Sequence, residues 1–253
     1  MKLHLLSIVL LLVFATNKNL YCQSQVSVNI HYTKRTEKLI DTIESSLAKE
    51  KVSRFNQMIS DEVKNLTYIL KVRHGHSVFQ EKKSLKTETS TNPIRSFASS
   101  YGGTRGTFFV NPKDSVYLNI REFSGVFFKV KIEPKIWKIH SDEHKYVGKY
   151  KCLKATTVDI IVNPKGVFTY NVVAWFSPEL PGIYGPAGYF GLPGLILELH
   201  NGKISLEANE LDFDTKKEKP FDIDDERGKL VTEKQYDSIV EKTTKDFFNI
   251  SEF

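Results

Sequence analysis

The chain is poor in cysteine, and its one long hydrophobic run lies at the N-terminus. Of its two cysteines, Cys22 follows that run closely, so removal of an N-terminal leader would leave Cys152 alone. A single cysteine excludes an internal disulfide, the bridge on which many small exported domains depend. About 229 residues would remain, which is enough for one sizeable hydrophobic core. We therefore expect packing to hold the mature chain together.

The N-terminal segment has the organisation of a secretory signal. Lys2 gives a positive start, and residues 3–15 are apolar apart from two positions, a stretch too short to span a bilayer comfortably. We expect residues 1–24 to be a signal peptide and residues 25–253 to form a single domain, without a transmembrane span. Small residues do not precede Cys22, so no lipid attachment is expected there. The protein should be exported, and periplasmic or associated with the outer membrane.

The charge balance is mildly basic. There are 36 lysines and arginines against 30 acidic residues, and loss of Lys2 and Lys18 with the leader lowers the basic count to 34. The lysines are scattered among acidic residues, and no basic stripe with interleaved aromatic residues is present. Nucleic acid is therefore not expected as a partner. The sequence also lacks a Gly-x-Ser-x-Gly turn, a zinc-protease motif and a phosphate-cradling loop, so no cofactor is expected.

Hydrophobic patterning predicts a mixed fold. Alternating residues favour a strand over 26–32, and helical spacing over 35–65 favours one or two amphipathic helices packed on a sheet. Residues 66–79 return to strand composition. Further short strands separated by turn sequences, which favour antiparallel pairing, are expected over 107–110, 115–120, 125–132, 136–140, 146–155, 158–162, 167–176, 195–199 and 204–213. A last helix is expected over 233–248, with Thr232 as its N-cap.

The run 167–176 is apolar on both faces of its predicted strand. Phe168 and Tyr170 lie on one side, and Val173 and Trp175 lie on the other. A long antiparallel sheet with two apolar faces must curl or close, with helices covering one side. The expected fold is α+β, with a large curved antiparallel β-sheet as a half-barrel or open barrel. Amphipathic helices should lie near the N-terminus and at the C-terminus, and the sheet should enclose an apolar concavity.

The most specific segment is a run over 181–196 that is punctuated by glycine and proline. Glycine permits positive φ and close backbone approach, whereas proline fixes φ and removes a donor. The run carries no strong nucleophile, which favours a rigid loop that buries apolar groups. A surface for an apolar ligand or a partner is the alternative. The candidate residues of this signature loop are Gly185, Pro186, Phe190, Gly191, Leu192, Pro193, Gly194, Leu195 and Ile196.

Residues 191–196 spell Gly-Leu-Pro-Gly-Leu-Ile, and segments upstream continue a recognisable pattern. The positions that carry this pattern are Trp137, Tyr150, Cys152, Lys154, Ala155, Trp175, Glu179 and Pro181. Over residues 130–200 the chain resembles the GLPGLI family of secreted Bacteroidetes proteins, a family without an established function. The resemblance implies no activity. It implies an association with TonB-dependent outer-membrane transporters.

Cys152 is the candidate for nucleophilic chemistry. It lies two residues from Tyr150 and from Lys154 in a predicted strand, so the three side chains share one face. If this face lined a cavity, the lysine could lower the thiol pKa and produce a reactive thiolate. The alternative is a buried, inert thiol beside a lysine whose ammonium reaches water. Glu179 and Glu198 are the carboxylates nearest the signature loop and could meet as an acid/base pair.

Two pairs of histidines are candidates for metal ligands. His74 and His76 would share one face of a predicted strand, and His140 and His144 flank what reads as a hairpin tip. Neither pair has the additional ligands that a structural zinc site needs. No metal site is therefore expected.

These features predict a non-enzymatic binding or accessory protein of the cell envelope. It would hold a hydrophobic or peptide-like ligand in the concavity, or dock on an outer-membrane transporter. Two alternatives remain open. One is a cell-envelope structural or interaction protein whose sheet edge pairs with a partner strand. The other is an enzyme that uses Cys152 or a carboxylate near the signature loop.

Overall fold

The computed structural model describes residues 27–36, 39, 46–82, 92–163, 166–213 and 228–248. The predicted signal peptide lies outside these residues. The strands are β1 (Val28–Thr36), β2 (Thr67–Arg73), β3 (His76–Glu81), β4 (Thr107–Asn111), β5 (Val116–Phe123), β6 (Val126–Lys131), β7 (Lys138–Val147), β8 (Tyr150–Asn163), β9 (Gly166–Ser177), β10 (Leu195–His200), β11 (Ile204–Asp212) and β12 (Lys229–Val231). The helices are α2 (Ser46–Lys64), α3 (Pro93–Ser100), α4 (Glu233–Phe248) and a short 3-10 turn, η2 (Pro186–Gly188).

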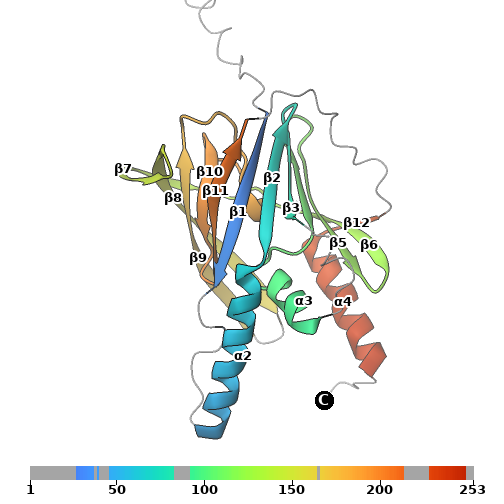
Figure 1. Ribbon diagram of the computed structural model, residues 1–253. Helices are drawn as coiled ribbons and strands as arrows, with labels where there is room; N and C mark the ends of the chain where they lie inside the picture. The colour runs from blue at the N-terminus through green and yellow to red at the C-terminus, as the bar shows by residue number, and fades with distance from the viewer. Residues whose placement is uncertain are drawn as a thin grey trace, which may run out of the picture.

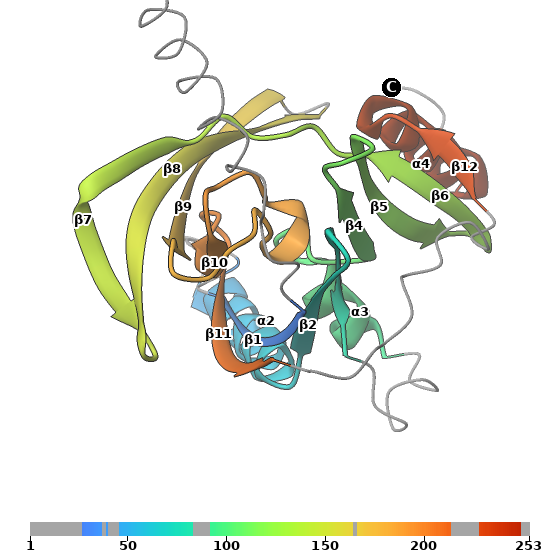
Figure 2. The same cartoon turned by 90° about the horizontal axis from the view of Figure 1, so that it is seen from above.

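All described strands belong to one sheet, built from two antiparallel runs. The order across the sheet is β12-β6-β5-β4-β3-β2-β1-β11-β10-β9-β8-β7. Strand β1 joins the runs because it pairs with both β2 and β11, while β12 pairs parallel with β6. The sheet is open and strongly curved (Figures 1 and 2). This confirms the expected α+β fold with a large curved antiparallel sheet.

The connection from β6 to β7 crosses the open side of the curve. Strand β6 lies near one edge of the sheet and β7 forms the opposite edge. Residues 132–137 therefore run from one arm of the curved sheet to the other (Figure 2). This crossing segment lies close to the site described below.

Helices α2 and α3 lie together at the lower end of β1 and β2 (Figure 1). Arg95 of α3 forms ion pairs with Glu62 of α2, at 2.8 Å, and with Glu81 of β3, at 2.6 Å. The ammonium of buried Lys34 donates a 2.8 Å hydrogen bond to the carbonyl of Ala98. These contacts fasten both helices to the sheet.

Helix α4 covers β6 at the other arm. Phe128 of β6 contacts Tyr236 edge-on, with ring centroids 5.4 Å apart. The helix begins at a capping box, in which the Gln235 amide donates to Thr232 Oγ1 and the Thr232 amide donates to Gln235 Oε1. The predicted helix over 233–248 and its N-cap are confirmed.

The main core lies on the inner side of the curved sheet. Alternation along β1 buries Val28, Ile30 and Tyr32 completely. The buried ring of Phe79 lies 5.4 Å from that of Tyr68 and 6.0 Å from that of Tyr32. Each such ring removes ~150–250 Å² from water, which makes aromatic packing a large part of the stabilisation.

Two predicted local structures are wrong. Residues 66–79 do not form one strand, because His74 and Gly75 have φ angles of 49° and 79° and make the turn between β2 and β3. The two histidines of this segment therefore do not share a strand face. Residues 141–143 are not a hairpin tip but a bulge inside β7, where the pairing shifts between His140 and His144.

Helix α3 was not expected, because 96–106 reads as rich in turn residues. Its start has a clear local cause. The side chain of Asn92 accepts a 2.9 Å hydrogen bond from the Ile94 amide, and Pro93 occupies the first turn. Both are favoured features of a helix N-terminus.

Candidate functional site

The signature loop lies inside the curve of the sheet. Residues 178–194 connect β9 to β10 and fold back over the inner face, together with η2 (Figure 2). Leu192 is 1% exposed, and Phe190, Leu195 and Ile196 are also buried. Nearby Gly185 and Pro186 are buried too, whereas Gly191, Pro193, Glu179 and Pro181 are exposed.

Contacts to both arms hold the loop in place. On one arm, the ring of Phe190 lies 4.5 Å from that of Tyr117 on β5. On the other, the Tyr189 hydroxyl donates to the Asp159 carboxylate of β8, and the Phe190 carbonyl accepts a 2.9 Å hydrogen bond from the Trp137 indole of the crossing segment. The inner face that could have formed an apolar concavity is thus occupied by the chain itself.

Gly194 shows why this loop needs glycine. A Cβ added there would lie 2.2 Å from the Ser177 carbonyl oxygen, far inside normal contact distance. Backbone lies on the other side of this contact, so no side-chain rotation can relieve it. The close approach lets β10 return beside β9, where Leu195 pairs with Ser177.

Cys152 is fully buried, and burial raises the pKa of its thiol to about 11. The thiol Sγ donates a long 3.7 Å hydrogen bond to the carbonyl of Tyr150. Lys154 does not activate it, because the Lys154 ammonium is 2.7 Å from the Glu143 carboxylate. A neutral thiol is a weak nucleophile, so this arrangement fits the inert alternative. Ala155 of β8 is also fully buried, opposite Ala174 of β9.

Glu198 lies in an ion-paired cluster on the outer side of β9 and β10. Its carboxylate is 2.6 Å from the Lys145 ammonium and 2.5 Å from His200 Nε2. Lys145 also lies over the ring of Trp175, 4.6 Å from the centroid. Burial would raise the pKa of Glu198, but the hydrogen bonds from His200 and Lys145 outweigh it and the net shift is downward. The carboxylate is therefore held ionised. Exposed Glu179 is not among its hydrogen-bond or ion-pair partners in the described residues, so the predicted acid/base pair is not formed.

Within the described residues, no group of three or more histidine, cysteine or acidic side chains is placed to hold a metal ion. His140 instead lies within 2.9 Å of Thr156 Oγ1, through its Nε2. Neither predicted histidine pair is therefore part of a metal-binding cluster within the described residues.

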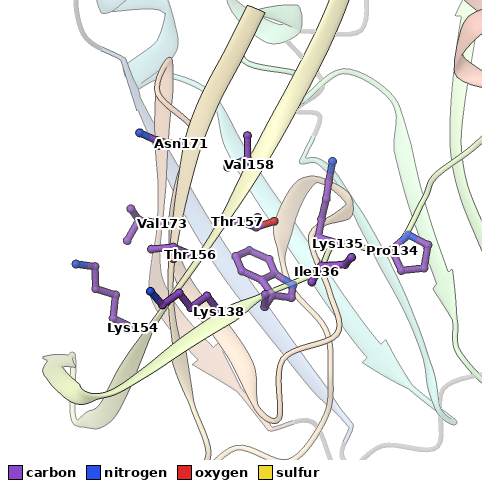
Figure 3. A pocket seen from close by; sticks show the side chains of 11 residues that line it. Pro134, Lys135, Ile136, Lys138, Lys154, Thr156, Thr157, Val158, Asn171 and Val173 are labelled. Atoms are coloured by element: carbon purple, nitrogen blue, oxygen red, sulfur yellow. The ribbon is translucent and has the colours of Figure 1, made fainter.

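An open depression lies between the crossing segment and the outer side of β8 and β9. Its volume is about 800 Å³. Cross-strand pairing builds its floor, because Thr156 lies opposite Val173 and Val158 lies opposite Asn171. The lining residues are Pro134, Lys135, Ile136, Trp137, Lys138, Lys154, Thr156, Thr157, Val158, Asn171 and Val173. We call this the outer depression (Figure 3).

The lining combines apolar and cationic groups. Lys138 and Lys154 lie together at one end of the outer depression, and Val158 and Asn171 lie at the other (Figure 3). Ile136 is 92% exposed at its rim. A site of this kind can hold apolar groups and attract negative charge, but the lining contains no carboxylate, thiol or histidine that could perform acid/base or nucleophilic chemistry.

Exposed apolar residues extend the outer depression toward the tip of the β8–β9 hairpin. Val158, Ile160 and Val167 are 45%, 66% and 68% exposed. Alternation places Val158 and Ile160 on one face of β8, and the antiparallel register places Val173 and Val167 on the same face of β9. We call these four residues the outer stripe. Its members are uncharged; Val158, Ile160 and Val167 are exposed, and Val173 is half-buried. An exposed apolar stripe of this kind is a candidate binding surface.

The sequence identified only part of this site. Trp137 and Lys154 line the outer depression. The signature loop packs inside the curve of the sheet and meets the depression at Trp137, whose indole donates to the Phe190 carbonyl. Lys138, Val158 and Ile160 were not singled out. Their strands were expected, but the faces left uncovered depend on where the loop and the helices pack, and the sequence carries no local signal for that.

Comparisons with known proteins place the fold more clearly than the family. A family model described as a protein of unknown function (Porph_ging) matches residues 164–198, which include all of β9 and the signature loop. No curated protein matches the chain.

Among solved structures, the structure of PNGF-II in the C2 space group is 16% identical, with a TM-score of 0.51. The match covers 86% of this chain and 33% of that one, so this chain spans about a third of PNGF-II. The same protein in the P21 space group is 15% identical over 86% of this chain and 34% of that one, with a TM-score of 0.48. At this identity the likeness concerns the fold alone.

Proposed function

We propose that this protein is an exported, non-enzymatic binding protein of the cell envelope, a member of the GLPGLI family that holds an apolar ligand in the outer depression. The observation that carries the proposal is the lining of that depression: apolar walls continuous with the outer stripe, beside three lysines. Export and a periplasmic or outer-membrane location rest on the N-terminal sequence. Docking on an outer-membrane transporter rests on the resemblance.

The proposed site differs from the one expected from sequence. The inner face of the described sheet is filled by Phe190, Leu192 and their neighbours in the signature loop. A ligand there would have to displace buried apolar groups, each of which contributes about 1.5–3 kcal/mol of burial. On the outer side, exposed apolar residues gain burial when a ligand arrives. The outer depression is therefore the more favourable site.

The chemistry of the remaining candidates supports binding over catalysis. Cys152 has a raised pKa and no access to water. Glu198 forms an ion pair with Lys145 and lies within hydrogen-bonding distance of His200 Nε2, and its pKa is lowered. Neither group is free to act as nucleophile or base at neutral pH.

Pairing of a partner strand along the free edge of β7 is less favourable. The edge strand has a bulge between His140 and His144. It also carries charged side chains, among them Asp142 and Lys145. Bulges and charges are the features that keep edge strands from pairing with other chains. The outer stripe on the β8–β9 hairpin, by contrast, contains no charged side chain that would oppose the binding of an apolar group.

The proposal is tested with phenylnaphthylamine, an uncharged dye whose fluorescence rises in apolar surroundings. We expect saturable binding of one dye per chain, which Ile160→Asp should weaken by about tenfold because it introduces a charge into the apolar contact. The matched control is Leu230→Asp, on an exposed apolar residue of β12 at the opposite edge of the sheet. Absence of saturable binding, or equal effects of both substitutions, would contradict the proposed site.

A further inference from the structure

The outer depression carries positive charge that its own lining does not balance. Three of its lining residues are lysines, and none is acidic. Lys135 and Lys154 reach carboxylates outside the lining, at 2.7 Å from Asp159 and 2.7 Å from Glu143. Lys138 is exposed, and no carboxylate of the described residues forms an ion pair with it. One ammonium at the end of the depression is therefore available to an anion.

The outer stripe continues away from this cationic end. Val173 lies opposite Thr156, which in turn pairs with Lys138 on β7. From Val173 to Val167 the strand advances six residues, or ~20 Å at the usual rise of a strand. One leaflet of a bilayer has a hydrocarbon thickness of about 15 Å, half of the full core. The stripe is long enough to accept one extended acyl chain.

An acyl chain suits this surface better than a peptide. The backbone groups of β8 and β9 are used in the ladder that joins the two strands. A peptide lying across the valines and isoleucine would bury its own amides without partners, which is costly. An acyl chain has no such groups and gains from burial of the exposed apolar side chains.

We propose that the outer depression binds a single-chain anionic lipid, with its head group at Lys138 and its acyl chain along the outer stripe. This inference rests on the proposed function and specifies its ligand. Lys154 lies beside Lys138 (Figure 3) and adds positive potential at the head group although it is paired with Glu143. The anionic head group of such a lipid complements the lysines, and its uncharged acyl chain complements the outer stripe.

The test is calorimetric titration of the protein with laurate, dodecanol and dodecyltrimethylammonium, all kept below their aggregation limits. These probes share a chain and differ in head-group charge. We expect laurate to bind at one site, with lower affinity for dodecanol and lower still for the cation. Added salt should weaken the binding of laurate, because an exposed ion pair is screened.

Variants locate both ends of the lipid. Lys138→Glu should weaken the binding of laurate by about fivefold, the effect of roughly one exposed ion pair, and leave dodecanol unaffected. Ile160→Asp should weaken both. The controls are Lys234→Glu on exposed α4 and Leu230→Asp on β12, which should change neither affinity.

The outcomes separate the two proposals. Equal affinities for laurate and dodecanol, with no effect of Lys138→Glu, would overturn the anionic-lipid inference and leave an apolar binding site. Binding of an acidic apolar peptide in preference to laurate, lost in the same variants, would also overturn it. Binding of none of the probes would overturn both. Unchanged circular dichroism of each variant shows that loss of binding is not loss of fold.

Discussion

Gly194→Ala gives a sharp test of how the signature loop is built. The added Cβ would lie 2.2 Å from the Ser177 carbonyl oxygen and 2.6 Å from its carbonyl carbon. Both belong to backbone that pairs with Leu195 at the start of β10. The junction of β9 and β10 must therefore separate by about 1 Å, in a region where Ser177 and Leu195 are fully buried.

Overpacking of this kind costs about 1–3 kcal/mol. We expect the free energy of unfolding to fall by ~3 kcal/mol, because the added Cβ meets backbone atoms that no side-chain rotation can move away. For a domain of this size, each 1 kcal/mol lowers Tm by about 2–4 °C. Thermal unfolding followed by circular dichroism should therefore show a decrease of ~6–12 °C.

Gly191→Ala is the matched control in the same loop. Gly191 has a φ of 99°, but its added Cβ would meet only the Trp137 ring, at 4.0 Å. Only backbone strain of ~1–2 kcal/mol is expected there. If Gly194→Ala costs no more than Gly191→Ala, the close approach of the loop to β9 is not what holds this corner together, and the reasoning is refuted.

Three further predictions concern buried groups. Leu192→Ala should lower the free energy of unfolding by about 2–5 kcal/mol, measured by denaturant titration; a loss below 1 kcal/mol would show that the loop is not part of the core. Burial lowers the pKa of Lys34 to about 7, against a smaller upward effect of Glu81. The unfolded chain thus binds more protons, and between pH 7 and 9 stability should rise with pH by at most about 1.4 kcal/mol per pH unit. Lys34→Met should abolish this slope, and an unchanged slope would exclude Lys34 as its source. Burial also raises the pKa of the Cys152 thiol to about 11, so alkylation of the native protein by iodoacetamide should be far slower than that of the unfolded chain; equal rates would contradict its burial.

Local patterns in the sequence predicted much of the fold. The apolar stripe of the last helix and its capping residues Thr232 and Gln235 all lie within one short segment. The bounds 233–248 could therefore be predicted from local sequence. The strand β1 likewise follows from alternation alone. Where two apolar runs meet at a short turn, as at His74-Gly75, periodicity continues across the turn and hides it.

The strand order could not be predicted, because it depends on pairing between distant segments. The junction of β1 with β11 and the crossing segment 132–137 have no local signal. These two features decide which face of the β8–β9 hairpin is covered and which is left open. The signature loop was the most specific part of the sequence, yet its buried side chains pack inside the curve of the sheet, and the loop reaches the outer depression through its contacts with Trp137 and Lys135.

Photolabelling with an uncharged alkyl diazirine tests the central claim most directly, because it reports where an apolar ligand lies on the folded protein. After irradiation and proteolysis, mass spectrometry identifies the labelled residues. The account predicts labels in 134–138 and on Val158, Ile160 and Val173, removed by competition with laurate. Labels concentrated in the signature loop, 178–194, would contradict it, because they would place the ligand on the inner face of the sheet.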